Sequence, residues 1–451
     1  MPAKLRVHTL GCKVNQYETE LVRQGLQSIG YQDAADGEQA DVCLINTCTV
    51  TDTGDAKSRQ VVRRMARQNP EARIVVMGCY ATRAPDEVAA LPGVAEVVTD
   101  KRELPDLMHR FGVHDVPTGL SGFAGRHRAY VKVQDGCLLR CSYCIIPMVR
   151  PQLSSRPVTH IVEEVERLVD AGHREVVLTG IHLGHYGVDW NRNKPREQWT
   201  RLAHLLEQLA DLPGDFRIRL SSIEATEVTR QLIAVMAAHP EKIVPHLHLC
   251  LQSGSDSVLR RMRRRWGTRM FLDRCDLIRD ALDRPSITTD IIVGFPGETE
   301  QEFQQTIQTS REAGFSKIHV FPFSRRRGTP AADMPDQVDK DVKADRVERL
   351  MGLESELRTE YFQSLVGSPL QLLIESISDS QSEGQAAAAL GTTCRYAPGS
   401  IETADLERLG LQPGQLIPCQ AVSTDGESLR LQAASSNQPR TSPQTLATTD
   451  S

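Results

Sequence analysis

The feature that most constrains this chain is the alternation of short apolar runs with amphipathic segments. In two long blocks, an apolar run is followed by a turn and then by a segment whose apolar side chains recur every three or four residues. Strands that alternate with helices form a parallel sheet, because each helix carries the chain back across the sheet. Ligands of such sheets bind at the carboxyl ends of the strands. The alternation therefore predicts an α/β protein with its sites at those ends.

The first block, residues 1–115, predicts a doubly wound parallel-sheet domain. Its three apolar runs are residues 5–10, 41–46 and 73–77. Each run is followed closely by a cysteine, and these are Cys12, Cys48 and Cys79. Since parallel strands end at one edge of the sheet, the three thiols should converge and hold an iron–sulfur cluster with one open iron. The alternative is three unrelated buried cysteines, a reading that suits Cys43, which lies inside its strand.

The second block begins after a segment rich in Gly, Pro, Ser and His, and we expect a linker over residues 116–128. The block itself, residues 129–366, contains six runs that predict strands: residues 130–133, 175–178, 217–220, 246–251, 287–293 and 317–321. Six strand–helix units are too few to close an eight-stranded barrel. The pattern therefore predicts a partial, open (β/α)6 barrel with its function at the carboxyl ends of the strands.

Three cysteines follow the first strand of this barrel at C-x3-C-x2-C spacing, and these are Cys137, Cys141 and Cys144. Three thiolates on a loop can hold three irons of a [4Fe–4S] cluster and leave the fourth iron open. A structural zinc site needs four ligands, and no second C-x2-C or H-x3-H pair lies near this one. Inert core thiols are the other alternative, but the residues between the cysteines do not alternate as in a strand. The spacing therefore favours a cluster.

This motif, with Tyr143 as the aromatic residue of C-x3-C-x-aromatic-C, resembles the signature of the radical S-adenosylmethionine (SAM) superfamily. The sequence CSYCIIP, followed by Arg150 and by Ser155 and Arg156, is similar to the methylthiotransferases of that superfamily. The resemblance implies that the open iron binds the amine and carboxylate of SAM, and that the electron of the cluster splits SAM to a 5′-deoxyadenosyl radical. The protein then has to hold the cofactor and direct the radical.

The first block carries a second match to the same family. Its TLGCKVNQYE at residues 9–18 and NTCTV at residues 46–50 resemble the N-terminal methylthiotransferase domain. The first of these motifs resembles the branch that modifies N6-threonylcarbamoyladenosine in tRNA. The resemblance implies a second, auxiliary [4Fe–4S] cluster on the three N-terminal cysteines, whose free iron carries the incoming sulfur.

The reaction implied by this resemblance is insertion of a methylthio group at C2 of N6-threonylcarbamoyladenosine next to the tRNA anticodon. One SAM methylates the sulfur, and another supplies the radical that removes the hydrogen from C2. An aromatic C–H is not acidic at neutral pH, so we expect no essential acid or base among the side chains. One alternative is the same chemistry on isopentenyladenosine in tRNA. An alternative of another class is a non-catalytic, metal-containing RNA-binding protein.

Polar and glycine residues cluster at the predicted strand ends of the barrel. Glycine lets the backbone approach a ligand closely, and polar side chains bind ribose hydroxyls and amino acid groups, although ordinary turns contain the same residue types. The segments LTGIHLGHYG, SSIE, LQSGSD and DIIVGFPGET resemble the cofactor-binding segments of the family. The predicted cofactor-binding residues are Tyr143, Gly180, Ser222, Glu224, Gln252 and Asp290. His182 and His185 receive no role, because loop histidines more often serve packing or solvation.

An arginine-rich run at residues 260–274 contains Trp266, and a second run covers residues 325–327. Arginine matches phosphate in geometry, and an aromatic ring among arginines can stack on a base. A charge run is usually a solvated helix face. However, the chain is acidic overall, at −5, and both runs border the predicted active face. The predicted RNA-binding residues are Arg260, Arg264, Arg265, Trp266, Arg325 and Arg327.

The last part of the chain changes its pattern. A long helix is predicted over residues 339–366, and short alternating runs then predict a small β-barrel over residues 367–434. Its position resembles that of the TRAM domain, which binds RNA at the end of methylthiotransferases. Cys394 and Cys419 fit the core of this barrel. Residues 435–451, rich in Ser, Thr, Pro and Gln, predict a disordered tail.

Composition limits the remaining classes. A chain of 451 residues with 40% apolar and 25% charged residues is typical of a soluble protein of two to three domains. It contains no run of about 18 apolar residues and no signal peptide at its start, so we expect a cytoplasmic protein without a membrane span. In a reducing compartment, its 11 cysteines fit metal ligands and core thiols. We expect a monomer that acts on tRNA with a reducing electron donor of flavodoxin or ferredoxin type and a sulfur source.

Overall fold

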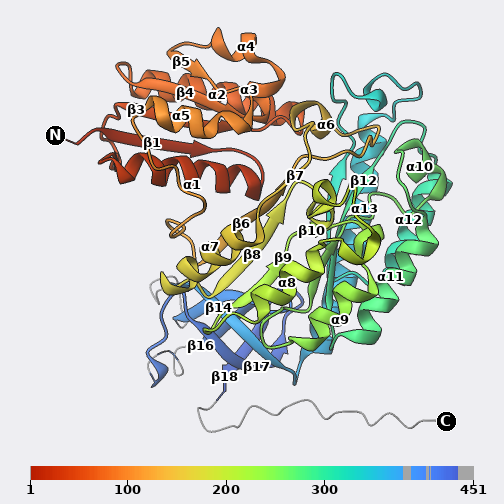
Figure 1. Ribbon diagram of the computed structural model, residues 1–451. Helices are drawn as coiled ribbons and strands as arrows, with labels where there is room; N and C mark the ends of the chain where they lie inside the picture. The colour runs from red at the N-terminus through yellow and green to blue at the C-terminus, as the bar shows by residue number, and fades with distance from the viewer. Residues whose placement is uncertain (1, 379–386, 403–405, 407, 435–451) are drawn as a thin grey trace, which may run out of the picture. The chain divides into compact units, whose positions relative to one another are not determined.

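Five parallel strands form the N-terminal sheet, in the order β2-β1-β3-β4-β5. Their bounds are β1 Lys4–Thr9, β2 Gln32–Asp33, β3 Val42–Thr47, β4 Arg73–Gly78 and β5 Val94–Val97. The computed structural model describes residues 2–378, 387–402, 406 and 408–434, so the predicted tail at 435–451 lies outside the described residues. All six residues of β3 are buried because helices cover both faces of the sheet. This arrangement confirms the predicted doubly wound sheet (Figure 1).

The two faces of this sheet have separate apolar cores. Helices α1 (Lys13–Ser28) and α5 (Leu104–Arg110) cover one face, where Val22 and Leu26 of α1 pack on Leu44 of β3. Helices α2 (Asp52–Gln68), α3 (Cys79–Arg83) and α4 (Pro85–Ala89) cover the other, where Val62 of α2 packs on Ile45. A short 3₁₀ helix, η1 (Lys101–Glu103), precedes α5. Adjacent residues of β3 therefore pack in opposite cores, because successive side chains of a strand point to opposite faces of the sheet.

The barrel consists of two four-stranded sheets, in the orders β7-β6-β8-β9 and β10-β11-β12-β13. The bounds are β6 Arg128–Asp135, β7 Ser154–Ser155, β8 Glu175–Gly180, β9 Arg217–Leu220, β10 Ser222–Ile223, β11 His246–Leu249, β12 Ser286–Val293 and β13 Lys317–Pro322. Only Ser221 separates β9 from β10, so the two sheets follow one another as an arch of parallel strands, with β7 antiparallel at its edge. This confirms the predicted partial, open barrel.

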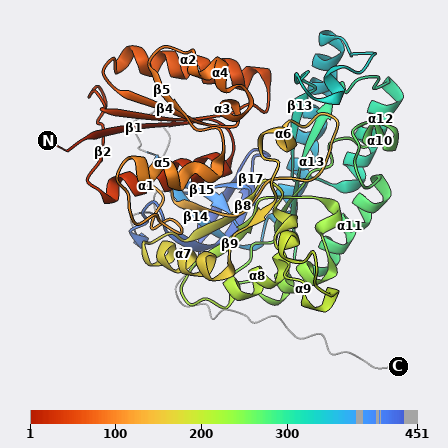
Figure 2. The same ribbon diagram turned by 45° about the horizontal axis from the view of Figure 1, so that its top comes forward.

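Helices pack on the outer side of the arch (Figures 1 and 2). They are α7 (Val158–Asp170), α8 (Leu202–Ala210), α9 (Arg230–Ala238), α10 (Asp256–Arg261), α11 (Thr268–Ala281), α12 (Glu300–Ala313) and the long α13 (Lys340–Leu365). The short α6 (Ile146–Val149) follows the cysteine loop. The 3₁₀ helices of this region are η2 (Leu183–His185), η3 (Val188–Trp190), η4 (Arg196–Gln198), η5 (Ala225–Glu227) and η6 (Pro330–Ala332). Helix α12 is an example of how the sequence sets the ends of these helices. Thr299 and Glu302 form a capping box at its start, and the left-handed backbone of Gly314 ends it.

The segment between the N-terminal sheet and the barrel was predicted as a linker over 116–128. Part of it packs in the core of the barrel. Leu120 and Phe123 are buried among the apolar residues of β6 and α7. Gln24 of α1 donates to the carbonyl of Gly122 at 2.8 Å and accepts from the backbone of Ser121 at 3.0 Å. The N-terminal sheet and the barrel belong to one compact unit, Met1–Tyr361.

The second compact unit, Phe362–Ser451, contains a closed barrel in the order β14-β15-β16-β18-β17. Its strands are β14 Pro369–Ser378, β15 Ala388–Thr393, β16 Pro398–Glu402, β17 Leu416–Thr424 and β18 Leu429–Ala433. Gly391 permits close contact between strands, since a Cβ there would lie 1.9 Å from the carbonyl oxygen of Leu373. Cys394 and Cys419 are buried in this barrel, as predicted.

No helix within the described residues is both long enough and apolar enough to cross a membrane.

The glycine at the end of β4 leads to a prediction about packing in the N-terminal sheet. Gly78 has φ +102°, and a Cβ there would lie 2.3 Å from Oδ1 of Asn46. Gly112 also has positive φ, +92°, but a Cβ there would meet nothing within 4 Å. We expect Gly78→Ala to lower the free energy of unfolding by about 2–4 kcal/mol and Gly112→Ala by about 1 kcal/mol, as measured by urea unfolding. Equal losses would contradict the steric account.

Candidate functional site

The loop that carries Cys137, Cys141 and Cys144 follows β6, and hydrogen bonds to its backbone hold it in place. Gly136 has φ +76°, and a Cβ there would lie 1.8 Å from the carbonyl oxygen of Gln152, so only glycine fits. Gln134 donates to the carbonyl of Gly136 at 2.7 Å. Farther along the loop, the backbone N–H of Ser142 donates to Met262 at 3.0 Å. The loop is therefore held at both ends.

The three thiols of this loop open into one cavity of about 190 Å³. Its lining residues are Cys137, Leu139, Cys141, Tyr143, Cys144, Ile146, Ile181, His182, Ser222, Ile223, Glu224, Cys250, Gln252 and Arg264. Four of the six predicted cofactor-binding residues, Tyr143, Ser222, Glu224 and Gln252, lie in this wall. The sequence prediction of a site at the strand ends thus corresponds to one cavity in the structure.

The other two predicted residues lie outside the lining. Gly180 packs against Gln134, whose Oε1 would be 3.0 Å from a Cβ. Oδ2 of Asp290 lies 3.3 Å from Nε2 of His248. Burial raises the pKa of the Cys250 thiol in the cavity wall, and the charge of Asp290 raises it further, so this carboxylate lies near Cys250.

The thiols fit a metal cluster by their chemistry. Burial raises the pKa of Cys144 to about 12, and the neighbouring Cys141 and Cys137 add to the rise. Without a cation, three close thiols resist deprotonation, whereas iron binds thiolates and supplies the charge that removes their protons. Arg264 adds a positive charge at the site, donating to Sγ of Cys141 at 3.3 Å. The three cysteines, with a cavity in front of them that has polar side chains in its wall, fit a [4Fe–4S] cluster with one open iron.

Two residues predicted to bind RNA are buried instead of forming an exposed face, and one of them, Arg264, lines the cavity. Arg264 pairs with Glu224, and Nε1 of Trp266 donates to the same carboxylate at 3.1 Å. Trp266 is only 6% exposed and packs against Phe271. Its ring therefore serves the core, and its polar edge orients Glu224.

The remaining predicted arginines are exposed: Arg260, Arg265, Arg325 and Arg327. Their neighbour Arg326 is buried, and it pairs with Asp55 of α2 at 2.6 Å. Asp55 also pairs with Arg83 at 2.6 Å and accepts from Thr49 at 2.6 Å. Arg326 thus links the end of the barrel to the segment next to Cys48.

His182, to which the sequence analysis assigned no role, lies in the cavity wall. Its Nδ1 is 3.5 Å from Sγ of Cys137, and its Nε2 is 3.4 Å from Oε2 of Glu227. The ring stacks on His185 at 3.6 Å, and burial lowers the pKa of His185 to about 4. A thiolate sulfur has no proton, so the imidazole is the donor in a contact with it. The signal in the sequence was a histidine two residues after Gly180, the last residue of a strand, and such histidines are too common for a role to be assigned from the sequence alone.

The three N-terminal cysteines also converge. Cys12 is the N-cap of α1, Cys48 follows β3, and Cys79 is the first residue of α3. A Cβ on Gly11 would lie 3.1 Å from Sγ of Cys48. Burial raises the pKa of Cys48, and Cys79 and Cys12 raise it further, as expected for thiols that face one another. The edge shared by β1, β3 and β4 therefore brings together the predicted set, and its chemistry fits a second cluster.

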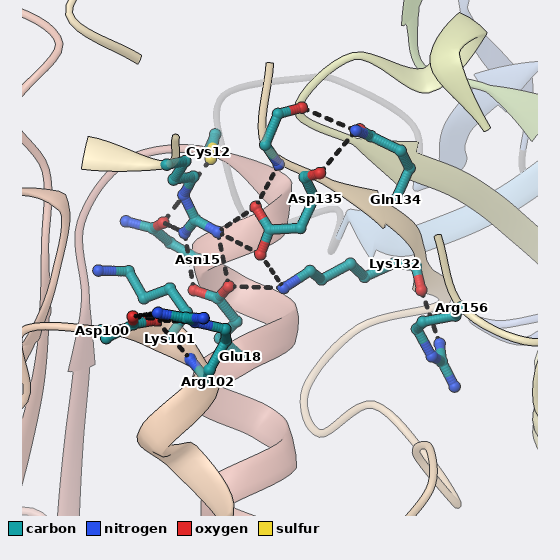
Figure 3. A network of polar contacts seen from close by, with 12 residues as sticks. Cys12, Asn15, Glu18, Asp100, Lys101, Arg102, Lys132, Gln134, Asp135 and Arg156 are labelled. Carbon is teal, nitrogen blue, oxygen red and sulfur yellow. Dashed lines mark hydrogen bonds and ion pairs between the residues drawn. The ribbon is translucent and has the colours of Figure 1, made fainter. Parts of the chain in front are cut away.

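The two cysteine sites are close neighbours. Cys79 packs in one apolar cluster with Ile145 and Val149, which follow Cys144 in the chain. Nearby, Arg150 lies buried between Glu18 of α1 and Asp135 of β6, at 2.8 Å from each carboxylate. Lys132 contacts the same two carboxylates, at 2.8 and 2.5 Å (Figure 3). A neutral set of four charges, two of them buried and two mostly buried, thus joins the N-terminal sheet to the barrel.

Comparison with known proteins agrees with this geometry. Residues 4–100 match a family model described as uncharacterized protein family UPF0004, and residues 131–309 match that of the radical SAM superfamily. The radical S-adenosylmethionine methyltransferase TsrM from Kitasatospora setae shares the fold, with a TM-score of 0.54 and 12% identity over 74% of this chain and 77% of that chain. The fold and the three-cysteine loop thus define a radical SAM enzyme, with SAM and a [4Fe–4S] cluster as cofactors.

Relatives narrow the class. A Bacillus subtilis protein named threonylcarbamoyladenosine tRNA methylthiotransferase MtaB is 44% identical over 391 residues, covering 83% of this chain and 85% of the relative. A Thermotoga maritima protein of the same name is 35% identical, covering 82% and 86%. A tRNA-2-methylthio-N(6)-dimethylallyladenosine synthase from Corynebacterium urealyticum is 37% identical, covering 82% and 72%. The chain belongs to the radical SAM methylthiotransferase family, which confirms the predicted resemblance.

The contact between His182 and Cys137 leads to a spectroscopic prediction. Hydrogen bonds to the sulfurs of a cluster raise its reduction potential, because they stabilise the more negative, reduced state. We expect His182→Ala to shift the potential of the cluster on Cys137, Cys141 and Cys144 to more negative values, as measured by redox titration with electron paramagnetic resonance. His204→Ala, a change on helix α8, is the control. An unchanged potential in His182→Ala would contradict a contact between donor and sulfur.

The buried charges lead to a prediction about acid stability. Burial alone would raise the pKa of Glu18, but Arg150 and Lys132 outweigh burial and lower it to about 2 from 4.5. A carboxyl with a lower pKa in the folded state stabilises the fold above its ordinary pKa, and that contribution is lost as the pH falls. We expect the free energy of unfolding to decrease between pH 4.5 and about 2, and to decrease less steeply in Glu18→Gln. Identical slopes in the two proteins would exclude this role for Glu18.

Proposed function

We propose that the protein inserts a methylthio group at C2 of N6-threonylcarbamoyladenosine next to the tRNA anticodon. The observation that carries the proposal is the pair of three-thiol sites side by side, with Cys79 of one packed against Ile145 and Val149 beside the other. Attaching sulfur to an unactivated aromatic carbon requires both hydrogen removal and sulfur delivery at one place. Two sites with one open iron each fit those two tasks.

SAM and the two clusters would supply the radical, the methyl group and the sulfur, and the residues of the chain would supply position and a closed environment. Tyr143, Ser222, Glu224 and Gln252 line the cavity in front of the first thiol set and would hold SAM there. Asp290 and Gly180, which lie outside this lining, would contact the bound cofactor as well. No side chain is assigned as an acid or base, because the C2 hydrogen is not acidic.

The choice of nucleoside rests on similarity. The relatives from Bacillus subtilis and Thermotoga maritima carry the name of the threonylcarbamoyladenosine enzyme, and the former is the more similar of the two at 44% identity. The second candidate is the dimethylallyladenosine reaction, favoured by the 37% identity with the Corynebacterium urealyticum protein. A non-catalytic RNA-binding protein is not proposed further, since the cavity and thiol sets are those of an enzyme.

The tRNA would be held by charge. The exposed Arg260, Arg265, Arg325 and Arg327 would contact its phosphates, and the TRAM-like barrel of the second unit would add an RNA-binding module. A reducing electron donor of flavodoxin or ferredoxin type and a sulfur source would complete the reaction of a monomeric, cytoplasmic enzyme.

Reconstitution without oxygen tests the two-cluster arrangement. The wild-type protein should contain about eight irons and eight sulfides per chain, and a Cys12→Ala, Cys48→Ala, Cys79→Ala triple variant about four. The triple variant should still release 5′-deoxyadenosine from SAM but form no methylthio product, because the first thiol set is intact. Zinc in place of iron, or product formation by the triple variant, would refute the proposal.

Nucleoside mass spectrometry identifies the substrate. The reconstituted protein is incubated with tRNA from a strain that lacks both types of methylthiotransferase. We expect the methylthio derivative of N6-threonylcarbamoyladenosine and no change in isopentenyladenosine. The opposite pattern would assign the second candidate reaction.

A further inference from the structure

Arg150 belongs to the sequence motif of the cysteine loop, but no step of the proposed reaction uses it. We propose that Arg150 is a positioning residue that sets the separation and orientation of the two cysteine sites. This inference rests on the proposed function, in which SAM at one site and the sulfur at the other have to reach the same carbon of the nucleoside.

Arg150 contacts both sites directly or through one residue. Its carbonyl oxygen accepts a hydrogen bond from the backbone N–H of Cys137 at 3.3 Å. Its guanidinium donates to Oδ1 of Asn15 at 3.1 Å, and the thiol of Cys12 lies 3.8 Å from the same oxygen. One residue thus connects a cysteine of the barrel loop with a cysteine at the start of α1.

Two carboxylates hold the guanidinium in place. Glu18 accepts from both terminal nitrogens, each at 2.8 Å, which is a bidentate pair. The two carboxylate oxygens of Asp135 accept from one of these nitrogens, at 2.8 and 2.9 Å. Asp135 also accepts a hydrogen bond from the backbone N–H of Gly136 at 2.8 Å. Figure 3 shows Glu18 and Asn15 on α1 facing Lys132 and Asp135 on β6. The side chain of Arg150 is 1% exposed, so water does not screen these contacts.

Asn15 carries the connection into the N-terminal sheet. Its amide nitrogen donates to the carbonyls of Leu10 at 2.9 Å and Thr47 at 3.1 Å, the residues that lead to Cys12 and Cys48. Asn46 in turn donates to the backbone of Asn15 at 2.9 Å. A displacement of the guanidinium would therefore move the N-terminal thiols relative to the barrel loop.

The geometry favours a planar fork over a point charge. The guanidinium reaches Glu18, Asp135 and Asn15 at once, because its donors diverge in one plane. An ammonium at this position keeps the charge but cannot span the three acceptors. A group transfer between two sites is sensitive to their spacing, since a 1 Å misplacement costs about a hundredfold in rate.

The experiment compares Arg150→Lys with Arg217→Lys in the reconstituted full chain. Arg217 is equally buried and pairs with Glu175 at 2.5 Å, but it lies at the start of β9, away from the cysteine sites. Three quantities are measured: iron content, 5′-deoxyadenosine release and methylthio product. A fourth is the distance distribution between the two clusters, obtained from their dipolar coupling in pulsed electron paramagnetic resonance.

For Arg150→Lys we expect iron content and 5′-deoxyadenosine release within about twofold of wild type, a loss of product of about tenfold or more, and a broader distance distribution. Arg217→Lys should keep the wild-type ratio of product to 5′-deoxyadenosine. Because Arg150→Lys keeps the charge but breaks hydrogen bonds of a buried side chain, a second variant tests the same junction. The balanced Glu18→Gln, Lys132→Gln variant, which removes one charge of each sign, should show the same uncoupling.

A fall of product and 5′-deoxyadenosine in parallel, or an unchanged distance distribution, would overturn the positioning role. The proposed function fails differently. If wild-type protein binds two clusters but makes no methylthio nucleoside, the reaction is wrong, and the distance distributions of wild type and Arg150→Lys still decide the role of Arg150.

Discussion

Parallel strands place their carboxyl ends at one edge of a sheet, and both cysteine sites depend on this constraint. In the N-terminal sheet, the edge of β1, β3 and β4 collects three thiols that lie far apart in the chain. In the barrel, the cysteine loop follows β6, and the ends of neighbouring strands supply the rest of one cavity. Positive φ at Gly78 and Gly136, where no side chain fits, lets the chain turn directly into each set of thiols.

The second constraint is the junction between the N-terminal sheet and the barrel. Breaking one partner out of a buried charge network is strongly destabilising, by about 3–5 kcal/mol, so such networks allow few alternative arrangements. The four charges of Glu18, Lys132, Asp135 and Arg150 form one such network, and Arg326 with Asp55 forms a second link near Cys48. An apolar interface alone would tolerate sliding, whereas directional hydrogen bonds specify a register.

Charged residues that look alike in the sequence have different tasks in the structure. Arg264 is desolvated and faces Glu224 and Cys141 inside the cavity wall, whereas Arg265 next to it is exposed. The same split separates Arg326 from Arg325 and Arg327. A run of arginines therefore contains both buried residues, which stabilise the fold, and exposed residues, which charge the surface. Only the packing of the tertiary structure distinguishes them.

The sequence alone determined the alternation of strands and helices and the two cysteine sets, because these depend on local periodicity and on spacing. The class of chemistry followed from the resemblance of the cysteine motifs to a known family. Cys12, Cys48 and Cys79 were predictable as one site because each follows a strand of a parallel sheet. Tertiary structure decided what depends on side-chain direction across long separations in the chain. The contact of His182 with Cys137, the burial of Trp266 and the four-charge junction at Arg150 each join residues from different elements, and no local pattern records which side chains will meet.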